Sequence, residues 1–155
     1  MINILNQPYD EFLNYIINHF PDAVATIIGS SNNREIRGKV DFFQTQYGVL
    51  VLSEVANLPA ISNNENFYAL KVDLNTTTSQ NIFNRKAKVR LNGLGELPDL
   101  LGNSGYSYSL VLTSYFTVDE ILGKQVTISR NRRDSQDNND ENIIASGIVV
   151  KYSQN

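Results

Sequence analysis

The chain has 155 residues, of which 41% are apolar and 19% are charged, with 13 Lys and Arg against 16 Asp and Glu. These values are typical of one soluble globular domain that is large enough to bury a full hydrophobic core. Because the chain has no Cys and a single His, its composition excludes disulfides, thiolate catalysis and metal sites built from several imidazoles. The net charge of −3 and the lack of a basic stripe argue against nucleic acid and anionic membranes as partners.

Residues 1–21 are predicted to contain one amphipathic helix, because apolar residues recur at spacings of three and four between Pro8 and Pro21. They are Tyr9, Phe12, Leu13, Ile16, Ile17 and Phe20. His19 falls in the last turn, where a cation favours the helix dipole, so it is not predicted to be a ligand. The apolar face must be covered either by the chain's own domain or by another chain, and the sequence leaves both open.

Nothing in the sequence predicts a membrane segment. No apolar run approaches the roughly 18 residues of a membrane-spanning helix, and the first residues lack the basic stretch of a signal peptide. We therefore expect a cytoplasmic protein that has no membrane partner.

Residues 22–155 are predicted to form one β domain. Eight short runs rich in Val, Ile, Tyr, Phe and Thr are separated by turn residues. They are residues 23–30, 35–44, 47–55, 67–74, 86–91, 106–114, 125–130 and 143–152. Because no helix separates these runs, we expect an all-β domain, an eight-stranded antiparallel Greek-key sandwich or barrel. The charged stretch at 130–141 mixes both signs and is interpreted as a solvated loop.

Several segments together carry a resemblance to a known family. They are Ala-Val-Ala-Thr-Ile-Ile-Gly at 23–29, Ile-Arg-Gly-Lys-Val-Asp-Phe at 36–42, Gly-Val-Leu-Val at 48–51 with Leu-Pro at 58–59, Gly-Glu-Leu-Pro-Asp-Leu at 95–100, Phe-Thr-Val-Asp-Glu-Ile-Leu-Gly-Lys at 116–124 and Ile-Ala-Ser-Gly-Ile-Val at 144–149. In their order and spacing over residues 23–150, they resemble the copper/zinc superoxide dismutase family, bacterial type.

The resemblance implies where the family's metal ligands would stand. The first two copper histidines fall at Tyr68 and Leu70, and the bridging histidine falls at Ile82. The zinc ligands fall at Arg90, Gly93 and Glu96, the last copper histidine at Ser129, and the channel arginine at Ile143. Of the seven ligand positions only Glu96 could bind a metal, and one His cannot supply the imidazoles that copper requires. The resemblance therefore implies a relative with no copper, no zinc, no other cofactor and no dismutase activity.

The vacated site is predicted to be filled by packing. On the strand at 67–74, the face that carries Tyr68 and Leu70 would look outward in the family, under the metal-binding loops. We expect these two side chains to join Ile82 in a small secondary core, with Arg90 and Glu96 paired at its rim.

Three functions remain open on sequence grounds. The first is a non-catalytic module that binds a protein partner or its own copies, or that serves a structural role. The second is an enzyme of another class on the same scaffold, although Ser129 has no nearby base and Asp119 and Glu120 lie in a predicted turn. The third is a small-molecule or carbohydrate binder that uses Tyr106, Tyr108 and Tyr115.

Overall fold

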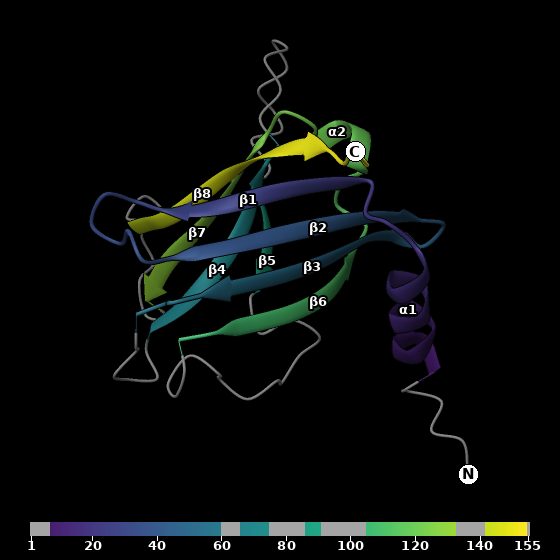
Figure 1. The fold of residues 1–155 in the computed structure, drawn as a ribbon, viewed down its shortest axis with the longest axis horizontal. Coiled ribbons are helices and arrows are strands. Elements are labelled where there is room, and N and C mark those ends of the chain that lie inside the picture. The colour runs from purple at the N-terminus through teal and green to yellow at the C-terminus, as the bar shows by residue number, and fades with distance from the viewer. Residues whose placement is uncertain (1–6, 60–65, 75–85, 91–104, 133–141, 155) are drawn as a thin grey trace.

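The computed structural model describes residues 7–59, 66–74, 86–90, 105–132 and 142–154 (Figure 1). Helix α1 (Gln7–Asn18) comes first, and a short helix, α2 (Val118–Ile121), lies between β6 and β7. The strands are β1 (Ala23–Gly29), β2 (Arg37–Thr45), β3 (Gly48–Ala56), β4 (Asn66–Asp73), β5 (Lys86–Arg90), β6 (Ser107–Thr113), β7 (Gln125–Arg132) and β8 (Asn142–Lys151). Each strand lies on a run predicted from the sequence, and the prediction of a mostly antiparallel β protein is confirmed.

The strands pair into one sheet in the order β5-β4-β7-β8-β1-β2-β3-β6, and every pair is antiparallel. The sheet is strongly curled, so that β4, β5 and β7 lie behind β1, β2 and β3 in Figure 1. Twist and curl bring the two halves of the sheet face to face. Among the described residues, β5 and β6 form the two ends of the sheet.

The inner face of the curled sheet holds the main hydrophobic core. Alternate residues of β1 point inward, and Ala23, Ala25 and Ile27 are fully buried. The same core cluster includes Leu70 from β4 and Ile128 from β7, on the opposite half. Contacts between the two halves therefore hold the sheet in its curled form.

A second, smaller core lies on the outer face of β2, β3 and β6. It consists of Phe43, Leu50, Leu52 and Leu110, against which Phe12, Leu13, Tyr15 and Ile16 of α1 pack. The sequence left open what covers the helix, and the structure shows that these side chains cover the chain's own sheet. Ile17, the next residue of the helix, is 77% exposed. No helix within the described residues combines the length and the apolarity needed to cross a membrane.

Helix α2 was not predicted, because Asp119 and Glu120 were interpreted as lying in a turn. Its start nevertheless has a sequence signal, since Thr117 and Glu120 have the spacing of a capping box. The Thr117 hydroxyl accepts a hydrogen bond from the Glu120 backbone N–H at 3.4 Å. Gly123 follows the C-cap with φ of +80°, a left-handed conformation that glycine adopts without strain. Asp119 and Glu120 are exposed in the first turn of this helix.

Candidate functional site

A copper site of the superoxide dismutase type would lie on one of the two faces of β4. Tyr68, Leu70 and Val72 are at most 2% exposed and belong to the main core. The Tyr68 hydroxyl donates a hydrogen bond to the Pro59 carbonyl oxygen, which satisfies this buried polar group. The prediction that Tyr68 and Leu70 form a separate core outside the sandwich is therefore wrong. Its third member, Ile82, lies outside the described residues.

The error concerns which face of β4 carries Tyr68 and Leu70, and that face depends on the register of the strand. A shift of one residue moves every side chain of a strand to the opposite face. If the family's aromatic-His-x-His pattern is placed on residues 68–71 instead of 67–70, the two histidine positions become Ala69 and Lys71. These positions alternate with Tyr68 and Leu70 and so belong to the outer face of the sheet.

Three positions of this outer face are described and buried. Ala69 lies opposite Ser129 of β7, and Lys71 is two residues further along β4. The exposed fractions of these side chains are 3%, 2% and 0% for Ala69, Lys71 and Ser129. Among the described residues, the Ser129 hydroxyl has no hydrogen-bond partner. The face therefore combines a methyl group, an ammonium group and a hydroxyl group, and the ammonium has no free electron pair for a metal.

The other predicted positions do not gather into a described site. The backbone of Arg90 in β5 lies opposite Ala69, whereas Gly93 and Glu96, and with them the predicted Arg90–Glu96 pair, lie outside the described residues. Ile143 is 46% exposed on β8. In the part of the chain that is described, no group of three His, Asp or Glu side chains is placed to hold a metal ion.

The tyrosines considered for ligand binding lie on β6 and at its two ends. Tyr108 packs against the outer core beside α1, whereas Tyr106 precedes β6 and Tyr115 follows it. The exposed fractions of Tyr106 and Tyr115 are 41% and 68%. A small-molecule or carbohydrate site at these tyrosines stays a prediction.

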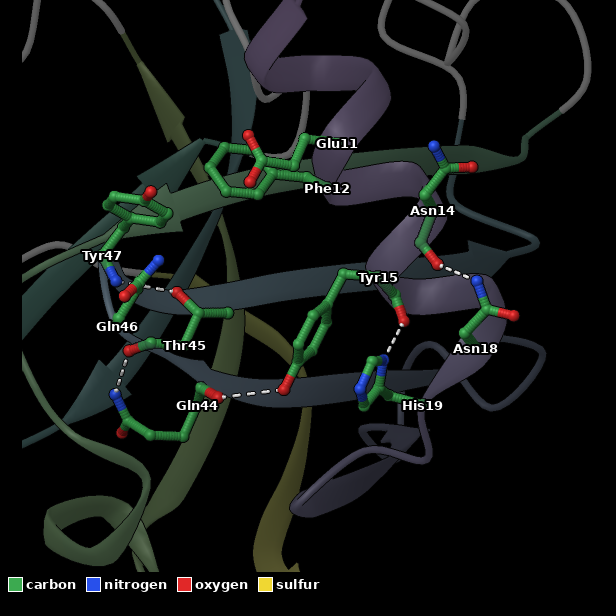
Figure 2. Close-up of a pocket in the computed structure, with 10 residues that line it drawn as sticks. All are labelled: Glu11, Phe12, Asn14, Tyr15, Asn18, His19, Gln44, Thr45, Gln46 and Tyr47. Atoms are coloured by element: carbon green, nitrogen blue, oxygen red, sulfur yellow. Dashed lines mark hydrogen bonds between the residues drawn. The ribbon is translucent and has the colours of Figure 1, made fainter.

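A pocket does lie between α1 and the turn that joins β2 to β3. Its volume is about 540 Å³, and its lining residues are Glu11, Phe12, Asn14, Tyr15, Asn18, His19, Gln44, Thr45, Gln46 and Tyr47. Figure 2 shows Asn14, Asn18 and His19 on the right, Gln46 and Tyr47 on the left and the Tyr15 ring between them, with Glu11 and Phe12 above Tyr47. The volume is within the roughly 300–1,000 Å³ of small-molecule sites.

Hydrogen bonds and ring contacts fix the floor of this pocket. The Tyr15 hydroxyl donates to the Gln44 carbonyl oxygen at 3.3 Å, and the His19 ring stacks on Tyr15 with the ring centroids 3.8 Å apart. His19 Nδ1 donates to the Tyr15 carbonyl oxygen at 2.8 Å, so the only histidine is held at the end of the helix. Phe12 and Tyr47 meet edge to face, with centroids 6.3 Å apart and an interplanar angle of 69°.

Sequence reasoning missed this pocket. It identified Phe12 only as part of an apolar helix face, and it gave no weight to Tyr47 or Gln46. The helix periodicity shows which side chains need cover, but not which part of the sheet covers them. The cluster of aromatic residues at 9–20 together with Tyr47 was the one available signal.

Comparison with protein-family models and with curated proteins yields no match to this chain.

Proposed function

We propose that the chain is a superoxide dismutase-like Greek-key domain that has lost the copper and zinc ligands and acts as a non-catalytic interaction or structural module. The strand order supports the fold part of this proposal. If the β5 and β6 ends of the sheet adjoin, β4 to β7 have the order β6-β5-β4-β7. That is the order of a Greek key, in which the fourth strand lies beside the first.

Residues of β4 and β7 support the functional part of the proposal, which is the loss of the metal ligands. With the histidine pattern on either residues 67–70 or residues 68–71, the two β4 positions hold Tyr68 and Leu70 or Ala69 and Lys71. Neither pair contains a nitrogen or carboxylate ligand for copper, and Ser129 occupies the position of the last copper histidine. Copper that cycles between two oxidation states in such a fold needs several neutral imidazoles, and the whole chain has one His.

Metal reconstitution tests this proposal. The purified chain is incubated with copper and zinc at neutral pH and dialysed, and its metal content is measured by mass spectrometry. We expect no stoichiometric metal and no dismutation above that of a boiled control. Recovery of about one tightly held copper per chain, together with activity, would overturn the proposal.

Apolar side chains on the outer face of β1 and β8 support an interaction role. Ile28, Ile148 and Val150 are each about half exposed, although they lie on strands in the middle of the sheet. Exposed apolar groups that gather on one face are typical of protein contact surfaces. Sedimentation velocity over a range of concentrations tests self-association, and Ile148→Lys should abolish any larger species without lowering the melting temperature.

A further inference from the structure

The pocket between α1 and the β2–β3 turn combines aromatic rings with a carboxylate. The rings of Phe12 and Tyr47 meet edge to face. Tyr47 is 56% exposed, so part of its ring remains open to a ligand. Glu11 lies beside Phe12 at the rim (Figure 2). Within the described residues, the side chains of Glu11 and Gln46 form no hydrogen bond or ion pair, so they are available to a ligand.

The charged side chains of α1 and of the segments next to it in the sequence are acidic. The sequence contains no Lys or Arg in residues 1–33 or 42–70, which include all of α1, β1 and β3 as well as the β2–β3 turn. Asp10 is adjacent to Glu11 on the helix, and the Asp22 carboxylate accepts a hydrogen bond from the Gln44 backbone N–H at 2.7 Å. Among the described residues of the lining, Glu11 carries the one carboxylate, and none is Lys or Arg. Such a site disfavours phosphates and carboxylates and favours a cation.

An organic cation fits this lining better than a neutral ligand or a metal ion. A metal ion is usually held by a cluster of carboxylates or imidazoles, and no group of three His, Asp or Glu side chains among the described residues is placed to hold one. The described lining offers one carboxylate and one imidazole, and its other polar side chains are neutral. The faces of aromatic rings attract ammonium groups through the ring quadrupole, and aromatic cages with this chemistry recognise quaternary and methylated amines. The methyl groups of such a cation pack against the rings while the charge is balanced by a carboxylate.

We propose that the pocket binds a small alkylammonium cation, with Phe12 and Tyr47 as the aromatic walls and Glu11 as the counter-ion. This inference uses none of the residues of the superoxide dismutase resemblance and holds or fails independently of it. The same chemical group occurs on free quaternary amines and on methylated lysine side chains of proteins, and the experiment distinguishes these two sources.

Calorimetric titration of the full chain tests the charge requirement. One probe is choline, and its control is 3,3-dimethyl-1-butanol, which has the same shape without the charge. A second pair is a short peptide with one trimethyl-lysine and the same peptide with the neutral analogue of that side chain, in which a tert-butyl group replaces the trimethylammonium group. We expect choline, the methylated peptide or both to bind at least tenfold more tightly than the matched control. Choline alone indicates a free amine, and the peptide alone indicates a methylated protein. Equal binding within both pairs, or no binding at all, would overturn the proposal.

Variants locate the cation in this pocket. Glu11→Gln keeps the shape of the side chain and removes its charge, so it should weaken binding at least tenfold. Asp10→Asn removes the same charge from the neighbouring exposed residue and should change the affinity less than twofold. Tyr47→Leu should also weaken binding at least tenfold, with thermal melts to show that the fold persists. An affinity unchanged by both Glu11→Gln and Tyr47→Leu would mean that the cation binds elsewhere and would refute the proposal.

Discussion

Ala69 of β4 lies directly opposite Ser129 of β7 on the outer face of the sheet, next to a register irregularity between Ile128 and Ser129. The Ser129 side chain is fully buried, and within the described residues its hydroxyl has no partner. A buried hydroxyl without a hydrogen bond destabilises the folded state, because it loses its bonds to water. This position is therefore a weak point of the fold.

The first prediction follows from that unsatisfied hydroxyl. Ser129→Ala removes the group and leaves a methyl of nearly the same shape, so the free energy of unfolding should rise by about 1 kcal/mol. Urea denaturation followed by circular dichroism measures the change. A loss of stability in this variant would contradict the prediction, because it would show that the Ser129 hydroxyl forms a stabilising hydrogen bond.

Ser53 and Ser109 give the contrasting case inside the sandwich. They lie opposite each other on β3 and β6, both are buried, and their hydroxyl oxygens are 2.6 Å apart. Ser53→Ala should cost about 1–3 kcal/mol, because it leaves the Ser109 hydroxyl buried and unpaired.

The double variant Ser53→Ala with Ser109→Ala removes both polar groups and should restore most of this loss. Double-mutant cycles by urea denaturation measure the coupling. Additive losses in the two single variants would contradict the view that each hydroxyl is the other's partner.

The strand pattern could be predicted from the sequence because short runs rich in β-branched and aromatic residues are bounded by turn residues, and in β1 burial also alternates with period two. The bounds of β1, for example, differ from the predicted run by one residue. The face of β4 could not be predicted, because residues 66–73 have apolar side chains on both faces and both faces are buried at residues 68–72. Alternation therefore did not distinguish the two registers of β4. The aromatic residue of the aromatic-His-x-His pattern can be matched to Phe67 or to Tyr68, one residue further along.

The pocket could not be predicted for a different reason. It depends on where α1 lies on the outer face of the sheet, and contacts such as that of Phe12 with Tyr47 join residues 35 positions apart. Periodicity shows that a helix face must be buried, whereas the cavity depends on how well the helix and the turn fit together. The expectation that this chain binds no copper has a different basis. It rests on residue counts alone, since one His cannot supply several imidazoles.

A close backbone approach at Gly147 supports a third prediction. A Cβ atom at this position would lie 2.1 Å from the Thr26 carbonyl oxygen of the neighbouring strand, which is closer than real contacts allow. Gly147→Ala should therefore push β8 away from β1 and cost more than about 2 kcal/mol.

Gly123→Ala is the matched control for this glycine. Apart from its two chain neighbours, no heavy atom of the described residues lies within 4 Å of a Cβ atom there, so the backbone strain at φ of +80° is the main cost, worth about 1 kcal/mol. Thermal melts compare the two variants. A larger loss at Gly123 than at Gly147 would contradict the close packing of β1 and β8.

The last prediction concerns the attachment of α1 to its own sheet. Ile16 packs against the outer core around Leu50 and Leu110, whereas its neighbour Ile17 is 77% exposed. Burying such a side chain stabilises a protein by roughly 1.5–3 kcal/mol, and a buried aspartate adds a desolvation cost. Ile16→Asp should therefore lower the melting temperature by at least about 5 °C, and Ile17→Asp should change it by less than about 2 °C.

Sedimentation equilibrium should give the same mass for both variants and the parent chain, because the apolar face of α1 is covered by the chain's own sheet. A lower mass for Ile16→Asp with an unchanged melting temperature would mean that the helix joins two chains in solution instead of covering its own sheet.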